Sequence, residues 1–247
     1  MKTKSTITLT KTEPSDAFPY KAPYEAVKIK YTYIFSIDYA LPQKFLKLFF
    51  DKLVALFFIL LTSPILLLLK IGFLVEGLFF KENRGPMFFS YNAISKGKIF
   101  KKYKIRIIKL KYIDPIGAKN GNWLAYSAEW NPKARTFLGS FVKKFYLDEI
   151  PQFYNVLIGD MSIVGPRPLS VMHYERDISQ GNISRKIIKG GLLGLGHIHK
   201  GDSQFGDPIH ELEYIDSYIK KSELELLLFD LQIIWRGFLL ILKGGGY

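Results

Sequence analysis

The chain has 247 residues, of which 48% are hydrophobic and 23% are charged, and its formal net charge is +13. This composition supports a packed core and excludes a globally disordered chain, while the basic excess favours anionic partners such as phosphorylated substrates, acidic lipids or nucleic acid. The absence of cysteine excludes disulfides, cysteine-ligated zinc and a cysteine nucleophile.

The first 30 residues are polar, with lysine, threonine and proline scattered through them. They lack the early apolar core that a signal peptide carries. We interpret Met1–Lys30 as a flexible cytoplasmic tail and residues 1–43 together as a polar N-terminal extension.

An apolar segment follows in residues 44–80, and its centre, Leu53–Leu69, contains no charge. The uncharged centre, Leu53–Leu69, makes about 25 Å of helix, which is at the short end for crossing about 30 Å of hydrocarbon. Ser63 and Pro64 lie inside it, and proline removes a backbone donor and kinks a helix. Cationic residues flank both ends, which favours the cytoplasmic face for both. We therefore predict a re-entrant helix-break-helix membrane segment; a simple span and a buried core helix remain alternatives.

Residues 81–144 form a basic stretch in which fifteen lysines and arginines face three acidic residues. Gly85-Pro86 and Asn131-Pro132 predict turns. Around Met87–Ile108, aromatic and β-branched residues are interleaved with lysines, which predicts short strands or loops.

Ile150–Ile158 has the apolar period of a helix, with Pro151 in the first turn and Gly159 placed to end it. Asp148 and Glu149 come just before this helix. There an acidic side chain either caps the first turn or, kept ionised by the helix N-terminus, acts as a nucleophile toward phosphorus.

Arg167 lies between Pro166 and Pro168. The two prolines hold its guanidinium on a stiff backbone, which suits a bidentate contact with phosphate. A surface arginine without this role is the alternative.

Apolar residues near the C-terminus recur with helical spacing and predict an amphipathic helix. The stripe consists of Leu224, Leu228, Leu231, Trp235, Phe238 and Leu242. Such a helix either lies in the membrane interface, with Trp235 at headgroup level, or turns this stripe toward a protein core.

Residues 147–169 read LDEIPQFYNVLIGDMSIVGPRPL. This long and specific block resembles the signature of the bacterial sugar transferases, the monotopic polyprenyl-phosphate phosphoglycosyl transferases. Shorter similarities extend the resemblance over about residues 44–247. They comprise Lys47 with Asp51, Ser63-Pro64, Arg84-Gly85-Pro86, Gly97–Phe100, Lys104–Arg106, and the set Asp216, Tyr218, Ser222 and Asp230.

The resemblance implies a helix-rich α+β fold in which the re-entrant segment of residues 44–80 precedes a cytoplasmic catalytic domain, residues 81–247, with interfacial amphipathic helices. It implies an enzyme of the bacterial inner (cytoplasmic) membrane whose active site lies on the cytoplasmic face. The implied reaction transfers a sugar 1-phosphate from a nucleotide-diphosphate sugar, expected to be a UDP-sugar, to polyprenyl phosphate. This is the first membrane step of glycan assembly. Membrane lipids are further partners, and nucleic acid is not expected.

On the same resemblance, Asp148 is the catalytic nucleophile that forms an aspartyl-phosphosugar intermediate, and Glu149 orients or deprotonates. The expected cofactor is Mg²⁺, bridging Asp148 and the substrate phosphates, as suits a hard cation with oxygen ligands. The expected substrate- or phosphate-binding residues are Arg167, Lys143, Lys104, Arg106 and Gln152.

The chain also departs from the family pattern. Ser90–Ser95 reads SYNAIS where the family has an arginine-rich stretch, Lys143 stands in place of an arginine, and His197 in place of a glutamine. These departures motivate a second hypothesis, a catalytically weakened relative that acts as a membrane scaffold in glycan biosynthesis. The charge of +13 motivates a third, a membrane-tethered nucleic-acid binder, although no nucleic-acid-binding motif is present.

Overall fold

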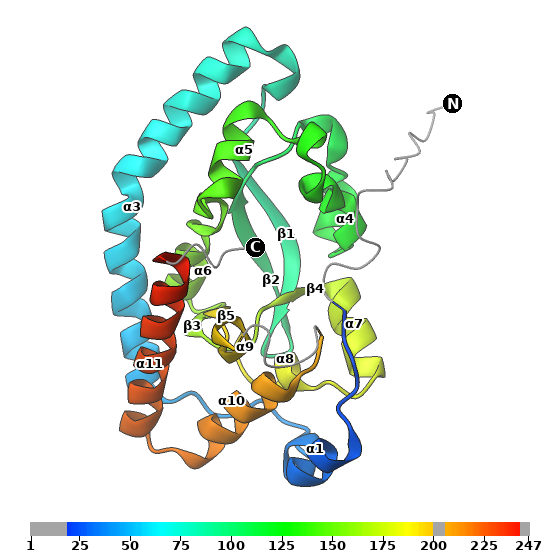
Figure 1. The fold of residues 1–247 in the computed structure, drawn as a ribbon. Coiled ribbons are helices and arrows are strands. Elements are labelled where there is room, and N and C mark those ends of the chain that lie inside the picture. Colours follow the sequence, from blue (N-terminus) through cyan, green and yellow to red (C-terminus); the bar gives the residue numbers. More distant parts are fainter. Residues whose placement is uncertain (1–18, 200–205, 243–247) are drawn as a thin grey trace.

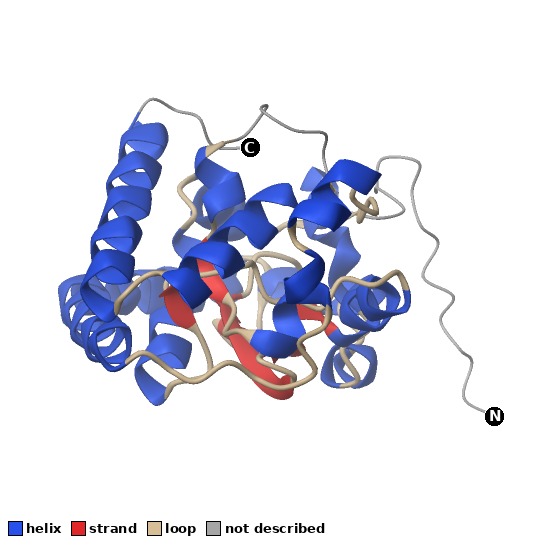
Figure 2. Cartoon of the chain, turned by 90° about the horizontal axis from the view of Figure 1, so that it is seen from below, coloured by secondary structure: helices blue, strands red, loops and turns tan. Residues whose placement is uncertain are grey.

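In the computed structural model, which describes residues 19–199 and 206–242, short strands lie among helices (Figures 1 and 2). A three-stranded antiparallel sheet has the order β2-β1-β4, and β3 pairs with β5 in parallel. The strands are β1 Phe88–Ser95, β2 Lys98–Ile105, β3 Ser162–Val164, β4 Leu169–Ser170 and β5 Gly191–Leu193. The prediction of a helix-rich α+β fold is confirmed.

Helices make up most of the remaining structure (Figure 2). The α-helices are α1 Glu25–Lys30, α2 Thr32–Phe35, α3 Phe45–Phe79, α4 Pro115–Lys119, α5 Phe137–Lys144, α6 Gln152–Ile158, α7 Val171–Ser179, α8 Ser184–Ile187, α9 Leu195–Ile198, α10 Ile209–Lys220 and α11 Glu223–Leu242. The 3₁₀ helices are η1 Lys81–Asn83, η2 Leu110–Tyr112, η3 Trp123–Trp130, η4 Pro132–Ala134 and η5 Leu147–Glu149. The helix expected over Ile150–Ile158 is α6, and Gly159 ends it with φ 92° as predicted.

The strands expected around Met87–Ile108 form the β1–β2 hairpin. Lys96 and Gly97 make its two-residue turn, with φ 52° and 70°. Positive φ at both central positions is the geometry that matches the right-handed twist of the flanking strands. The resulting register pairs Tyr91 with Lys102.

The N-terminal extension contributes to the core. Val27, Tyr31, Ile34 and Leu41 are each at most 6% exposed and belong to the largest apolar cluster of the described residues, together with side chains of α6, α8, α10 and α11. The interpretation of Met1–Lys30 as a flexible tail is therefore wrong for residues 19–30, because burying an apolar side chain such as Val27 is favourable. Residues 1–18 lie outside the described part.

The apolar segment forms α3, a single helix that continues through Pro64. The expected break is instead a change of direction within a continuous helix (Figure 1). Pro64 cannot donate to the carbonyl of Leu60, but the Ser63 hydroxyl donates to that oxygen at 2.8 Å. This bond satisfies the acceptor that proline leaves without its usual partner, so the helix need not end.

Both ends of α3 pack on the rest of the protein, while its middle is mostly exposed. Buried positions lie near the start, at Lys47, Asp51 and Ala55, and near the end, between Leu69 and Gly77. Only 11% of its most apolar 18-residue window is buried, so the buried-core alternative is wrong. Within the described residues, α3 is the one helix long and apolar enough to cross a membrane, judged by length and composition alone.

Buried polar contacts fasten the start of α3 to the domain. The Lys47 ammonium lies 2.6 Å from the Asp230 carboxylate of α11 and donates to the Val164 carbonyl of β3 at 3.0 Å. Asp51, one helical turn on, accepts bonds from the Ser162 hydroxyl and the Ile163 amide at 2.6 and 3.0 Å. Three elements distant in sequence therefore meet at one polar cluster.

A single carboxylate fastens the other end of α3. Glu76, which is 8% exposed, accepts hydrogen bonds from the backbone amides of Phe137 and Leu138 at 2.7 and 3.2 Å. These amides open α5, where the first N–H groups lack partners within the helix. A negative charge at this helix end is favourable, so Glu76 ties α3 to α5.

The predicted C-terminal helix is α11, which lies beside the lower part of α3 (Figure 1). Its core side is formed by Leu226, Asp230 and Ile233, each at most 1% exposed. The predicted stripe faces outward instead, and its described members Leu224, Leu228, Leu231, Trp235 and Phe238 are 41–61% exposed. The core-facing alternative is therefore wrong for this stripe.

Candidate active site

The acidic pair follows a sharp reversal of the chain. α5 ends at Lys144, and Tyr146 adopts φ 56° and ψ 19°, a left-handed conformation that is unfavourable for a bulky side chain. The 3₁₀ turn η5 then carries Asp148 and Glu149, and α6 begins at Gln152. This reversal turns the Asp148 carboxylate inward, where it is 1% exposed.

Asp148 lies among lysines. Its Oδ2 is 3.2 Å from the Lys104 ammonium of β2 and 4.0 Å from that of Lys143 at the end of α5. Neither carboxylate oxygen accepts a hydrogen bond of good geometry from a described residue. Asp148 therefore does not cap α6, and the capping interpretation is wrong. A buried carboxylate with unfilled acceptor positions is available to a ligand.

Lys104 bridges two acids, because its ammonium is also 3.0 Å from Glu129 of η3. Burial alone would lower the pKa of Lys104, but the charges of Glu129 and Asp148 outweigh it and raise that pKa well above its ordinary value. Lys104 therefore stays charged beside Asp148. Glu129 received no predicted role from the sequence, although it is one of only three acids between Lys81 and Lys144.

Glu149 forms a second ion pair, with its Oε1 2.6 Å from Arg167 in the loop between β3 and β4. Both side chains remain partly accessible, at 28% and 27%. Burial raises the pKa of Glu149, but the charges of Arg167, Lys102 and Lys104 outweigh burial and hold it far below the ordinary value. The structure therefore brings Arg167 to the acidic pair.

Lys143 is the most accessible lysine of the group, with a side chain 24% exposed. Its ammonium also lies 5.5 Å from the centre of the Trp130 ring. Burial, and next the charge of Lys104, lower its pKa. The surroundings therefore disfavour a second positive charge beside Lys104. An anionic ligand would offset this repulsion and favour the charged form of Lys143.

Gln152 and Arg106, the two remaining residues predicted to bind substrate, differ in their hydrogen bonding. Gln152 is 1% exposed, and its Nε2 lacks a hydrogen-bond partner within the described part of the chain. Arg106 instead donates to the carbonyls of Asn83, Pro86 and Ile108, all at 2.8 Å. Its guanidinium thus holds three backbone segments together, and these hydrogen bonds do not join it to the acidic pair.

Two residues near the acidic pair received no role from the sequence. Lys102 of β2 is 1% exposed, and its charge acts on Glu149. His197 of α9 accepts a hydrogen bond from the Gly194 amide at 2.9 Å. Burial, followed by the charge of Arg167, lowers the pKa of His197 to about 4, so the ring is neutral at pH 7.

The donor set suits a magnesium ion shared with a ligand. Mg²⁺ is usually held by one or two carboxylates together with substrate phosphates and water. Asp148 offers two oxygens that accept no well-formed hydrogen bond from a described residue. Across residues 19–199 and 206–242, no group of three or more His, Asp or Glu side chains is arranged to hold a metal. Protein ligands alone would therefore be too few.

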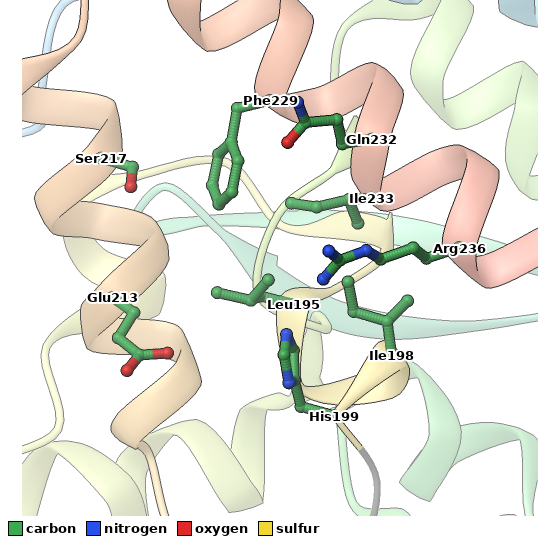
Figure 3. Close-up of a pocket in the computed structure, with 9 residues that line it drawn as sticks. All are labelled: Leu195, Ile198, His199, Glu213, Ser217, Phe229, Gln232, Ile233 and Arg236. Carbon is green, nitrogen blue, oxygen red and sulfur yellow. The ribbon is translucent and has the colours of Figure 1, made fainter.

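A separate cavity of about 280 Å³ lies between α9, α10 and α11 (Figure 3). Arg236 extends into it from α11, while Glu213 and Ser217 lie across it on α10. None of its lining residues is a predicted site residue. The acidic pair, not this cavity, therefore holds the chemistry that the sequence indicates.

Comparison with known proteins identifies the family. Residues 42–244 match the family described as bacterial sugar transferase. The chain is 32% identical over 207 residues to the galactosyl transferase CpsE of Streptococcus agalactiae, covering 79% of this chain and 45% of that protein. It is 32% identical over 200 residues to a UDP-glucose:undecaprenyl-phosphate glucose-1-phosphate transferase of Klebsiella pneumoniae, covering 78% of this chain and 39% of that protein.

A shorter relative is covered almost throughout. The uncharacterized sugar transferase EpsL of Bacillus subtilis is 33% identical over 190 residues, which are 74% of this chain and 83% of that protein. By contrast, the chain spans less than half of the length of the Streptococcus and Klebsiella relatives. The family match nevertheless includes α3, the acidic pair and α11. The chain belongs to the bacterial sugar transferase family.

Proposed function

We propose that this protein transfers a sugar 1-phosphate from a UDP-sugar to a polyprenyl phosphate, through a covalent intermediate on Asp148. The observation that carries the proposal is the Asp148 carboxylate, which is buried beside Lys104 and Lys143 with unfilled acceptor positions. The activities of related proteins support the substrate classes: one relative is a UDP-glucose:undecaprenyl-phosphate glucose-1-phosphate transferase. Another is a UDP-N-acetylgalactosamine-undecaprenyl-phosphate N-acetylgalactosaminephosphotransferase.

The proposed reaction has two displacements at one phosphorus atom. An Asp148 oxygen attacks the β-phosphorus of the donor, which bears the sugar, and the bond from that phosphorus to the bridging oxygen breaks. UMP leaves with the bonding electrons. An oxygen of polyprenyl phosphate then attacks the same phosphorus and releases the Asp148 carboxylate. The product is a polyprenyl-diphosphate sugar, and the enzyme is regenerated.

The surrounding charges suit this chemistry. Phosphoryl transfer depends largely on positioning and on stabilising negative charge that shifts among oxygens. Lys104 keeps its proton because its pKa is raised, so it remains a fixed cation beside the nucleophile. Arg167 presents a planar guanidinium suited to phosphate, and its ion pair with Glu149 orients it.

Magnesium would be held by Asp148 together with the donor phosphates. When bound, the ion would supply positive charge that offsets the charge developing on the phosphate oxygens. Glu149 is already engaged by Arg167 and is assigned the role of orienting that arginine. The side-chain nitrogen Nε2 of Gln152, which is buried and lacks a partner among the described residues, is a candidate donor to a substrate oxygen.

The membrane attachment is proposed to be re-entrant, with both ends of α3 on the cytoplasmic side of the inner membrane. A straight helix of 35 residues would be about 52 Å long, far more than one span requires. Yet its start contacts α11 and β3, and its end contacts α5 and η1 of the same domain. Because both ends of α3 pack on the same domain, we expect both to lie on the same side of the membrane.

The outward apolar side chains of α11 extend this proposed membrane surface. Its exposed stripe includes Trp235, at 61% exposure, and aromatic residues favour the level of the headgroups. α5 adds the exposed Phe137 and Phe141, and Phe145 follows directly after the helix. Isolated exposed apolar residues are ordinary, but a large apolar surface indicates a partner or a membrane.

The decisive experiment replaces the nucleophile. We expect Asp148→Asn to fold and to bind a UDP-sugar but to release no UMP, because an amide of nearly the same shape is an inadequate nucleophile. Asp38→Asn, which changes an exposed aspartate, is the matched control and should release UMP at the wild-type rate. UMP would be measured with UDP-sugars and polyprenyl phosphate in detergent micelles.

A trapping experiment tests the intermediate itself. Wild-type protein given a UDP-sugar without acceptor should gain the mass of a phosphosugar, and peptide mapping should locate it on Asp148. An adduct on another residue would refute the assignment of the nucleophile. Substantial UMP release by Asp148→Asn would have the same consequence. Wild-type protein that forms no adduct and releases no UMP would instead favour the scaffold hypothesis.

A further inference from the structure

Lys102 is a buried lysine without a counter-charge of its own. It lies on β2 and is 1% exposed, and within residues 19–199 and 206–242 its ammonium makes no hydrogen bond and no ion pair. Lys104, two residues further along the same strand, is also buried, at 6% exposure, but its ammonium contacts two carboxylates. Removing an ammonium group from water without a partner is strongly unfavourable. The position of Lys102 therefore calls for an anion.

The nearest strand offers no competing cation. β1 contains neither lysine nor arginine, and the register places Tyr91 opposite Lys102, with the ammonium 6.0 Å from the ring centre. Alternate residues of a strand share a face and lie about 7 Å apart, so Lys102 and Lys104 point the same way. The Lys104 ammonium lies 3.2 Å from Asp148, and Lys102 lies two residues before Lys104 on the same face of β2.

Titratable and charged groups of several elements surround Lys102. The charged groups are Lys104 of β2 itself, Glu129 of η3, Glu149 of η5 and Arg167 of the β3–β4 loop, and the neutral groups are Tyr91 of β1 and His197 of α9. Glu149 is the acid with the largest effect on Lys102, and it is already paired with Arg167. Burial, and next the charge of Arg167, lower the pKa of Lys102 to about 7.

We propose that Lys102 is a substrate-binding residue whose ammonium contacts the diphosphate of the nucleotide-sugar donor, on the phosphate that leaves with the nucleoside. The inference rests on the proposed function. Lys104 adjoins the nucleophile and so faces the phosphorus under attack, whereas Lys102 lies one strand repeat away on the same face of β2, where the charges of Arg167 and Glu149 act on it. The diphosphate of the donor supplies the counter-charge that the Lys102 ammonium lacks within the described part of the protein.

This arrangement couples donor binding to a proton. A bound phosphate stabilises the charged form of a neighbouring lysine and so raises its pKa. Above pH 7, where Lys102 of the free protein is increasingly neutral, binding must therefore take up a proton. The affinity for the donor is expected to fall by up to about tenfold per pH unit. Each unit above the pKa lowers the fraction of protein with a protonated Lys102, the form that binds the donor, by about tenfold.

The test uses UDP as the probe, with affinity measured by calorimetry on the full chain in micelles from pH 7.5 to 9. Over this range phosphate groups, with a second pKa near 6, no longer titrate. Lys102→Met should bind UDP about tenfold more weakly at pH 7.5, as expected for a lost charged hydrogen bond, and lose most of the pH dependence. Lys102→Arg should bind UDP but show the same flattened pH profile, because arginine does not deprotonate.

Lys101→Met is the matched control, since this neighbouring lysine of β2 is exposed and should leave both affinity and pH profile unchanged. Wild-type protein that binds UDP and releases UMP, together with Lys102 variants that share its affinity and pH profile, would overturn this inference alone. Failure of the wild-type protein to bind UDP or to release UMP would overturn the proposed function and, with it, the role of Lys102.

Discussion

Replacing Asp230 by asparagine should destabilise the protein through the lysine that it leaves behind. The Lys47 and Asp230 side chains are 8% and 1% exposed and 2.6 Å apart, and Tyr214 donates to the second Asp230 oxygen at 2.9 Å. Breaking such a buried pair from one side costs about 3–5 kcal/mol, because the remaining ammonium keeps only a more distant carboxylate, that of Asp51 at 4.0 Å. The amide can still accept one bond, so we expect about 3 kcal/mol.

For a chain of this size, a loss of about 3 kcal/mol corresponds to a fall in melting temperature of about 6–12 °C. The fall would be measured by thermal unfolding in micelles. Lys220→Met is the matched control, since it removes an exposed partner of Asp216 and should change stability by less than about 1 kcal/mol. The double variant Lys47→Met with Asp230→Leu should recover most of the loss. A single variant as stable as wild type, or a double variant no better than the single, would refute this reasoning.

Two further predictions concern the site and the membrane. Arg167→Lys should lower kcat/KM about ten- to a hundredfold, because lysine keeps the charge but loses the planar fork that pairs with Glu149 and phosphate; near-wild-type kinetics would remove Arg167 from the site. In this cysteine-free chain, Lys30→Cys and Lys81→Cys, introduced singly at exposed positions, should both resist an impermeant thiol reagent in intact cells and react after lysis. Labelling of either one in intact cells would contradict the re-entrant topology.

Local signals explain which parts of the fold could be predicted. α6 was predictable because apolar period, an early proline and a terminal glycine all lie within about ten residues and agree. The β1–β2 hairpin was only partly predictable, since its lysines occupy positions that a strand normally leaves to apolar side chains. Lys102 and Lys104 are tolerated there because the sheet face they share belongs to the candidate site.

The site itself could be predicted only as far as its local motif. Asp148, Glu149 and Arg167 lie within twenty residues, whereas Glu129 meets Lys104 across a separation of 25 residues. Arg106 is a further example: it lies two residues from Lys104, but β2 has ended there and backbone carbonyls, among them that of Asn83, hold its guanidinium. Which partner a charged side chain finds depends on tertiary structure, and no periodicity in the sequence contains that information.

The course of α3 was likewise decided by a detail beyond hydropathy. Proline at position 64 correctly indicated a disturbed helix, but the hydroxyl of Ser63 replaces the missing donor at the Leu60 carbonyl. A helix break and a helix bend share the same sequence signal, and a single side-chain hydrogen bond separates them.

The pairing of Lys47 with Asp230 also has a consequence for biosynthesis. The two residues are 183 positions apart, which at about 5–20 residues per second means roughly 10–40 s of translation between them. During that interval Asp51, one turn along the same helix and 4.0 Å away, is the neutralising group that Lys47 already has. In the proposed topology the helix can thus enter the lipid carrying its own balanced pair. When α11 has been synthesised, Asp230 forms its ion pair with Lys47 and fixes the start of α3 to the domain. Membrane insertion and completion of the fold are therefore separate events in time.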